Sequence, residues 1–373
     1  MSDERVFRVR GAGLEAEQAA RGARFGDVAG VRVAMGYSGM EAEYRALREG
    51  VGVADRGWVG RLEIVGEDRR RFLNGLVTCD VKELGAGDGR YGFVTGPQGK
   101  ILADVVVLGL EDRLWLELPA GMTESIAGHL RKYVVADRVE VRPLAEMVPI
   151  LVAGPRAAAL LDDWEGLPAA SWAHRKASLG GTEARVVRQG RSGVEAFSVW
   201  VSGSVAGSVW EWLLAEGERR GVPPTGPAGP AAPVGYEALD LVRVEGGVGR
   251  CGQDFGDANF PQETGEEAEA VSYTKGCYLG QEVVARIHYR GGVQNALRGL
   301  LLPGSEPAAL GTALLFDGRE VGRLTSAVAS PRLGRAVGLA IVHRRAWEPG
   351  TIVRLGEQGG EAEVVELPFV ARA

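Results

Sequence analysis

Two stretches of the chain repeat one order of strands and helices, and this order limits the folds that are possible. In the first stretch, Arg61–Val65 alternates polar and apolar residues, as a half-buried strand does. A helix that Asp68 can cap follows, and then strands at Ile101–Leu108 and Leu114–Leu118. Apolar residues at helical spacing over Met122–Tyr133 predict a second helix. Strand, helix, strand, strand, helix predicts a layered α+β domain.

The second stretch repeats the pattern. Pro149–Gly154 indicates a strand, and Arg156–Leu161 indicates a short helix. Further strands are predicted around Val186 and at Ala196–Val201, followed by a helix around Leu213. The sequence therefore favours a duplicated α+β unit, although the two halves share little residue identity.

Beyond about Gly292 the sequence pattern changes to that of closely spaced short strands. Short apolar runs separated by Gly, Pro or Asp follow at Leu297–Leu302, Ala313–Phe316, Glu320–Thr325, Ala336–Val342 and Thr351–Leu355. Closely spaced short strands with turn residues between them are typical of a small antiparallel barrel or sandwich. We therefore place a domain boundary near residue 292.

The expected organisation has three parts. Residues 1–43 are rich in Arg, Gly and Ala and poor in large apolar side chains, which predicts an extension that is partly ordered at best. Residues 44–291 form the two α+β units, and residues 292–373 form the barrel. The Pro- and Gly-rich segment Gly221–Pro233 is expected to be a surface loop rather than a linker, because a periodic helix over Tyr236–Val244 follows at once.

Composition excludes several functional classes. The formal net charge of −6, from 43 basic and 49 acidic residues, argues against extended nucleic-acid binding. Cys79, Cys251 and Cys277 make an odd, sparse set without a disulfide pattern, which indicates a reducing compartment such as the cytoplasm. The sequence shows no apolar run that predicts a signal peptide or a membrane span, and no metal-site spacing.

The densest polar segment runs from Lys275 to Glu282, with Arg286 beyond it. Gly276 and Gly280 lie on either side of Cys277, so the backbone can turn tightly there. A nearby ammonium and the start of a predicted helix both favour a thiolate, the reactive form of cysteine. Cys277 is therefore either a reactive thiol or a small half-buried apolar residue.

Four other residues are candidates for ligand contacts, each with a structural alternative. Asp104 lies in an apolar strand, where it binds a ligand amine or caps a turn. Arg243 is a candidate to bind an anionic tail of a ligand, and Glu245 to accept a hydrogen bond from a ligand donor. Alternatively, the two form an exposed ion pair. Trp58 stacks on a flat heterocycle or packs in the core.

The segment Lys275-Gly276-Cys277-Tyr278-Leu279-Gly280-Gln281-Glu282 resembles the signature of YgfZ-type folate-binding proteins, which are bacterial relatives of the glycine-cleavage T-protein, an aminomethyltransferase. Phe72–Val81 is similar to the first helix of that family, and Arg243–Gly247 to its central motif. Gly322–Ser326 is similar to part of its C-terminal barrel. The resemblance covers about residues 45–370.

The resemblance implies a T-protein-like ring of three subdomains around a central folate-sized cavity, the last subdomain being the small β-barrel. It implies a tetrahydrofolate ligand, or a one-carbon derivative of it, and a role in assembling or repairing iron–sulfur clusters of client proteins, with effects on tRNA modification through them. The expected site comprises the catalytic residues Cys277 and Lys275, the folate-binding residues Trp58, Asp104, Arg243 and Glu245, and supporting positions at Gly276, Tyr278, Gly280, Gln281, Glu282 and Arg286.

The sequence departs from the aminomethyltransferase pattern in places. An adjacent acidic pair of that family appears here as Ala103-Asp104, and Ser198 replaces an acid expected to bind the pterin. Leu239 stands where some relatives carry a tryptophan. These changes favour the iron–sulfur role, with a folate-dependent aminomethyl or methyl transferase as the alternative and a scaffold without folate as a third possibility.

Overall fold

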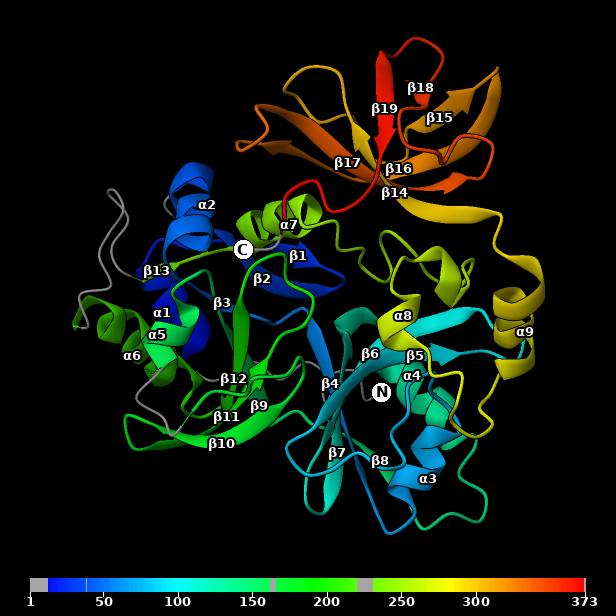
Figure 1. Cartoon of the computed structure of the whole chain (residues 1–373). Helices are drawn as coiled ribbons and strands as arrows, with labels where there is room; N and C mark the ends of the chain where they lie inside the picture. The colour runs from blue at the N-terminus through cyan, green and yellow to red at the C-terminus, as the bar shows by residue number, and fades with distance from the viewer. Residues whose placement is uncertain (1–12, 38, 162–165, 220–230, 372–373) are drawn as a thin grey trace.

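The computed structural model describes residues 13–37, 39–161, 166–219 and 231–371 of the chain. Two sheet-and-helix lobes lie side by side, and a β-barrel lies over them (Figure 1). The described residues therefore form an α+β fold with a C-terminal barrel, as the sequence predicts.

The first lobe contains a five-stranded antiparallel sheet in the order β5-β6-β7-β4-β8. Its strands are β4 (Val59–Val65), β5 (Gly89–Thr95), β6 (Ile101–Gly109), β7 (Arg113–Pro119) and β8 (Glu140–Pro143). Helices α3 (Arg69–Asn74) and α4 (Thr123–Arg131) cover one of its faces. The strands predicted in this stretch are confirmed, but Asp68 does not cap α3 with its side chain. Its carboxylate instead accepts the backbone N–H of Arg138.

The second lobe contains a six-stranded sheet in the order β10-β11-β12-β9-β3-β13. Its strands are β3 (Gly52–Asp55), β9 (Met147–Ala153), β10 (His174–Leu179), β11 (Thr182–Arg188), β12 (Ala196–Ser202) and β13 (Ala232–Pro233), with helices α5 (Ala157–Leu161) and α6 (Ala206–Arg219). The run β10-β11-β12-β9 has the same connectivity as β5-β6-β7-β4. The predicted duplication is thus present in the topology. The short strand β13 lies at the end of the segment expected to be a loop, whose residues 221–230 are outside the described part of the chain.

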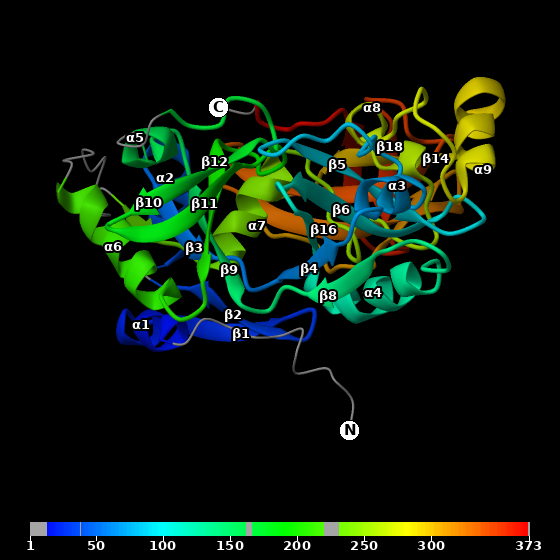
Figure 2. The ribbon, with the colours of Figure 1, turned by 90° about the horizontal axis from the view of Figure 1, so that it is seen from below.

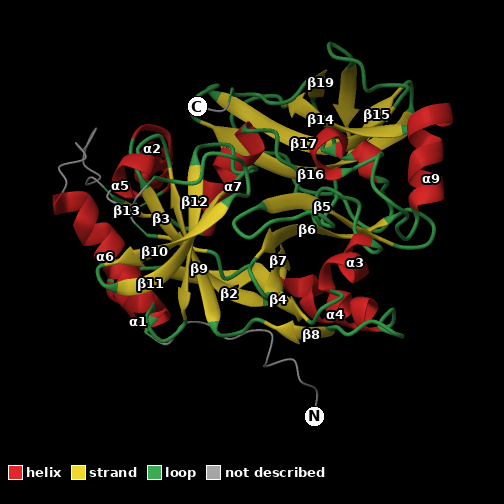
Figure 3. Cartoon of the chain, turned by 60° about the horizontal axis from the view of Figure 1, so that its bottom comes forward, coloured by secondary structure: helices red, strands yellow, loops and turns green. Residues whose placement is uncertain are grey.

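The two sheets pack face to face, with helices on their outer sides (Figure 3). Trp115 of one sheet stacks on Trp200 of the other at 5.3 Å between ring centroids. Because helices cover one face and the other sheet covers the opposite face, β4 is buried along almost its whole length rather than on one side.

The N-terminal region differs from the expected extension over its described residues. It forms α1 (Leu14–Ala20), the hairpin β1 (Arg24–Val28) and β2 (Val31–Gly36), and α2 (Met40–Glu49). Leu14 is buried with the core of the second lobe, and Val33 is fully buried. In Figure 2 this hairpin lies along the lower edge of the view, below β3 and β9. A few apolar residues anchor the segment, which its Arg- and Gly-rich composition conceals.

The barrel closes in the order β14-β17-β16-β15-β18-β19. Its strands are β14 (Asn295–Leu301), β15 (Ala313–Phe316), β16 (Arg319–Ser330), β17 (Arg335–His343), β18 (Ile352–Leu355) and β19 (Glu361–Val365). Along the chain, helical segments follow the second lobe and precede the barrel. They include α7 (Tyr236–Glu245), α8 (Glu267–Ala270), α9 (Gln281–Arg286) and the π-helical turn η4 (Ile287–Gly291). The barrel prediction is confirmed. The limits given for the domains stay predictions.

Candidate functional site

A cavity of about 230 Å³ lies between the two sheets and beneath α7. Residues from both sheets, from the β1–β2 turn, from α7 and from two connecting segments line it. They include Ala29, Arg56, Trp58, Tyr91, Asp104, Glu117, Gln189, Arg191, Leu239, Arg243, Gly249, Arg250 and Cys251. Of the expected site residues, the structure brings Trp58, Asp104 and Arg243 together here.

The pleat of β6 places Asp104 in the cavity. Successive side chains of a strand point to opposite faces, so Asp104 shares a face with Val106 and Leu108. Val106 and Leu108 belong to the core between the two sheets, whereas Ala103 and Val105 pack under the helices of the first lobe. The carboxylate therefore faces the space between the sheets, and the turn-capping alternative does not apply.

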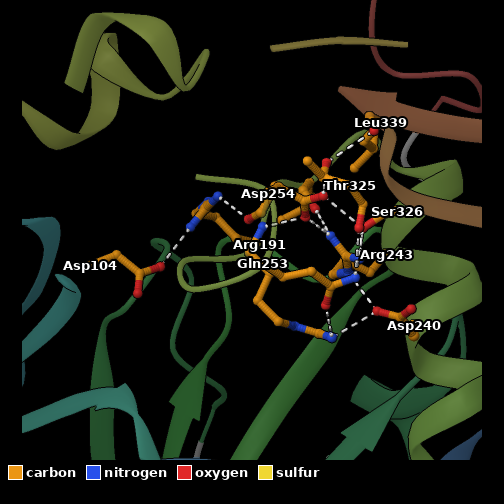
Figure 4. Close-up of polar contacts among 12 residues, drawn as sticks. Asp104, Arg191, Asp240, Arg243, Gln253, Asp254, Thr325, Ser326 and Leu339 are labelled. Atoms are coloured by element: carbon orange, nitrogen blue, oxygen red, sulfur yellow. Dashed lines mark hydrogen bonds and ion pairs between the residues drawn. The ribbon is translucent and has the colours of Figure 1, made fainter. Parts of the chain in front are cut away.

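Arg191 lies against Asp104 (Figure 4). Its Nη1 is 3.4 Å from Oδ2 of Asp104 and 2.5 Å from the hydroxyl of Tyr91, which itself donates to the same Oδ2 at 3.2 Å. Its Nη2 is 2.9 Å from Glu266 and donates to the carbonyl of Gly249 at 3.0 Å. One buried guanidinium thus joins the first sheet to the segments that follow α7 and precede α8.

The pKa values of Asp104 and of the neighbouring Cys251 are both shifted. Burial raises the pKa of Asp104, while the positive charge of Arg191 acts in the opposite direction. Burial also raises the pKa of the Cys251 thiol far above its usual value, and the Asp104 carboxylate adds to the effect. Cys251 is therefore a neutral thiol in the cavity wall, as the structural interpretation of a buried cysteine requires.

An aromatic and aliphatic wall completes the cavity. Trp58 contacts Tyr236 edge to face at 5.2 Å, so its ring is held in position by the start of α7. Leu239 lies one helical turn further along and also lines the cavity. The cavity wall thus has an aliphatic side chain at the position where the resemblance implies a tryptophan in some relatives.

Ser198 lies one layer behind the wall. It is fully buried, and its hydroxyl accepts a hydrogen bond from Arg56, which lines the cavity. Arg56 also pairs with Glu117 at 3.0 Å, and Glu117 accepts the indole N–H of Trp200 at 3.1 Å. The serine orients a cavity arginine here and is not itself among the residues that line the cavity.

Arg243 reaches the cavity, but most of its hydrogen bonds join parts of the fold. It donates to Asp240 at 2.7 Å, to the Val248 carbonyl at 2.7 Å, to Asp254 at 2.6 Å and to Ser326 of β16 at 2.7 Å (Figure 4). It therefore connects α7 to the barrel. This setting differs from that of an exposed ion pair, and four of its five N–H groups already have protein acceptors.

Glu245 is fully buried and is not among the residues that line the cavity. Its carboxylate accepts hydrogen bonds from Tyr44 at 2.9 and 3.0 Å, from Ser330 of the barrel and from Arg48. The structure thus gives Glu245 a role in joining α2, α7 and β16 instead of the expected ligand contact.

Lys275 is buried at the end of α3. Its Nζ donates to the backbone carbonyls of Asn74, Val77 and Cys79, each at 2.7 Å. The last carbonyls of a helix lack partners within the helix, and this ammonium supplies one. Burial lowers the pKa of Lys275 to about 8. The side chain therefore anchors its loop to α3, which differs from the expected activation of Cys277.

Cys277 is exposed and lies outside the residues that line the cavity. Helix α9 begins four residues later, as predicted, after Gly280 with a φ of +83°. A side chain at Gly280 would meet the Gly96 carbonyl at 2.5 Å, so glycine is required there. Tyr278 is buried beside the Lys275 ammonium. The segment thus holds Cys277 at the surface.

The remaining positions of that segment lie on the outer side. Glu282 and Arg286 line a shallow surface depression with Tyr289 and Arg290, and Gln281 opens α9. Among the described residues, no group of His, Cys, Asp or Glu side chains is arranged to hold a metal ion. No helix of the described residues is long and apolar enough to cross a membrane.

Sequence reasoning missed Arg191, Tyr91 and Glu266. The available signal was local: Arg191 lies between Gly190 and Gly193, and a charged residue within a glycine-rich connection after a buried strand is a candidate for a ligand site. Its partners come from distant parts of the chain, so sequence spacing did not reveal them.

Comparison with known proteins agrees with this architecture. Residues 14–272 match the GCVT N-terminal domain, and residues 295–371 match the glycine cleavage T-protein C-terminal barrel domain. An aminomethyltransferase of Rubrobacter xylanophilus is 31% identical over 363 residues, which cover 96% of this chain and 94% of that protein. An aminomethyltransferase of Bacillus subtilis is 25% identical over 355 residues, covering 93% and 95%.

A solved structure shows the same fold. The glycine cleavage system aminomethyltransferase T of Bartonella henselae aligns with a TM-score of 0.84 and 25% identity, covering 96% of this chain and 97% of that one. The three-subdomain arrangement that the resemblance implies is thereby confirmed. By the match of both domains and the similarity along nearly its whole length, the chain belongs to the glycine cleavage T-protein family.

Proposed function

We propose that the protein binds tetrahydrofolate in the cavity between its two sheets and transfers a one-carbon unit to or from it, as a folate-dependent aminomethyl or methyl transferase. The observation that carries the proposal is the Asp104 carboxylate, which faces a largely apolar cavity of about 230 Å³ whose wall includes Trp58 and Leu239. Small-molecule sites combine such apolar walls with a few convergent polar groups.

The residues present fit a pterin. A flat heterocycle with ring N–H groups suits an aromatic side chain beside it and a carboxylate that accepts its hydrogen bonds. Both side-chain contacts of Asp104 reach Oδ2, so a ligand donor would approach Oδ1. Ligand pockets typically span about 300–1,000 Å³, so this cavity suits the ring end of a folate, with the rest of the molecule toward the opening.

Within this proposal, bound tetrahydrofolate supplies the nitrogen that accepts the one-carbon unit. Trp58 would flank the ring, and Asp104 would orient it and attract the proton of a ring N–H. The cavity walls would limit the access of water to the reacting nitrogen. Arg243 would contribute indirectly, by holding α7 against the barrel.

The first test is binding. Isothermal titration with tetrahydrofolate should give a measurable Kd, and Asp104→Asn should raise that Kd by about 10- to 100-fold, because a buried charged acceptor is lost. Asp112→Asn is the matched control, since Asp112 lies in the turn between β6 and β7, is exposed and is not among the cavity residues. Equal affinity of the two variants would refute the assignment.

The second test is transfer. The purified protein is incubated with tetrahydrofolate and a glycine-derived aminomethyl donor, and methylenetetrahydrofolate is measured. In that reaction the carbon becomes bonded to two folate nitrogens, each of which loses a proton. Its bonds to the amine and to the carrier group of the donor break, and both leave with these protons, the amine as ammonia. Product that still forms with Cys277→Ala supports a transferase. Folate binding without any product refutes the transfer step.

The exposure of Cys277 favours a second candidate, the folate-linked assembly or repair of iron–sulfur clusters. A thiol at the surface, next to the start of α9, is within reach of a partner protein. One cysteine supplies one of the four ligands that a cluster usually needs, so client or carrier proteins would supply the others. In cells, Cys277→Ala should lower the activity of cluster-dependent enzymes, including those that modify tRNA. Unchanged activity would exclude this function.

A further inference from the structure

We infer that Arg191 is the positioning residue of the cavity and that it acts through Asp104, holding its carboxylate ionised and turned so that one oxygen is presented to the ligand. The inference rests on the proposed folate function and names a residue that sets which groups of the ligand the cavity accepts. Figure 4 shows the guanidinium of Arg191 beside the carboxylate of Asp104.

The geometry fixes the orientation of the carboxylate. The Arg191 guanidinium lies over the ring of Tyr91 at 4.3 Å, and both side chains reach the same oxygen, Oδ2 of Asp104. Glu266 and the Gly249 carbonyl hold the other nitrogen of Arg191. A guanidinium tied at both ends cannot rotate freely, so the carboxylate that it contacts is oriented as well.

The charges around Asp104 explain why a cation is needed. Tyr91 from β5, Glu266 ahead of α8 and Cys251 from the segment after α7 face it besides Arg191. Of these, Arg191 alone brings a positive charge, while Glu266 brings a second negative one. Burial raises the pKa of Asp104 and Arg191 lowers it. Without the arginine, a buried carboxylate beside another carboxylate binds a proton readily.

The state of Asp104 decides what the cavity recognises. An ionised carboxylate only accepts hydrogen bonds, so it selects a ligand that presents N–H donors, whereas a protonated one also donates. The Arg191–Asp104 pair therefore selects the N–H edge of a reduced pterin. The charge of Arg191 is already balanced by its two acidic neighbours, Asp104 and Glu266. This end of the cavity therefore offers no net positive charge to an anionic group of a ligand.

The test is the pH dependence of tetrahydrofolate binding between pH 5.5 and 8.5. The wild-type Kd should not change with pH, once the effect of protonation of the ligand, which is measured separately, has been subtracted. In Arg191→Gln, Asp104 takes up a proton as the pH falls, so the Kd should rise by up to tenfold for each pH unit. Arg191→Lys keeps the charge and should restore the flat profile. A uniform loss of affinity in Arg191→Gln without a pH dependence overturns the inference.

A double-mutant cycle separates action through Asp104 from general damage to the fold. If Arg191 acts through Asp104, the loss caused by Arg191→Gln should disappear when Asp104 is already Asn, whereas additive losses refute the inference. Arg188→Gln is the control, because Arg188 pairs with Glu195 and is not among the cavity residues, so its affinity and pH profile should match the wild type. A wild-type protein that binds no tetrahydrofolate refutes the proposed function and this inference together. Binding with an additive cycle refutes the inference alone.

Discussion

Replacing Lys275 with methionine should destabilise the protein without abolishing chemistry in the cavity. The ammonium donates three hydrogen bonds of 2.7 Å to backbone carbonyls, one at the last residue of α3 and two in the segment that follows it. Hydrogen bonds to a charged group contribute about 1.5–3 kcal/mol each, so their loss costs about 5–9 kcal/mol. Burial lowers the pKa of Lys275 from 10.5 to about 8, and removing that buried charge returns about 3 kcal/mol. The free energy of unfolding should therefore fall by about 2–6 kcal/mol.

Urea denaturation followed by circular dichroism measures this change, with Lys82→Met as the control because Lys82 is exposed on the neighbouring segment. The wild-type protein should also gain stability as the pH rises from about 8 to about 10.5, since the unfolded chain then binds more protons at Lys275 than the folded chain does. That gain should be absent in Lys275→Met. A variant that is as stable as the wild type but inactive would refute this reasoning and return Lys275 to a catalytic role.

Three further outcomes are expected. A thiol reagent at pH 8 should label Cys277 alone in the native protein and all three cysteines after denaturation, because Cys79 and Cys251 are buried; mass spectrometry of the labelled peptides checks this. Burial lowers the pKa of His174 to about 4, so stability should fall as the pH drops from about 6.5 to about 4, and pH-dependent urea melts of His174→Gln should lack that fall. Arg243→Met should cost about 3–5 kcal/mol by leaving its buried acidic partners unpaired, and limited proteolysis should then cleave between α7 and the barrel.

The fold was predictable wherever local pattern and burial agree. Apolar runs and helical spacing predicted β6, β7, α4 and four of the barrel strands near their observed limits, whereas β16 continues five residues beyond its predicted end and β19 was not predicted. The N-terminal segment escaped prediction because so few of its residues make the contacts that order it. Leu14 is buried in the core of the second lobe, and β2, which contains Val33, packs on α7. Only the short alternation Val31-Arg32-Val33 indicates a strand in this segment.

The site was predictable only in part, because its charged residues acquire their roles from partners that sequence does not reveal. Trp58 and Asp104 both line the cavity, and each could be chosen as a candidate from a single strand or loop, while their contact with folate stays a prediction. Glu245 and Lys275 looked equally suited to chemistry. In the structure, Glu245 instead accepts hydrogen bonds from buried hydroxyl and guanidinium groups, and Lys275 donates to a carbonyl at the end of α3.

The contrast between Lys275 and Arg191 shows what distinguishes a structural cation from a functional one in this fold. Both are buried, and both contact oxygen atoms from distant segments. Lys275 contacts backbone carbonyls outside the cavity, so its removal weakens the fold everywhere that α3 packs. Arg191 contacts a titratable side chain that lines the cavity, so its removal changes a protonation state that a ligand encounters. The difference is measurable because only the second changes the pH profile of binding, whereas both change the midpoint of unfolding.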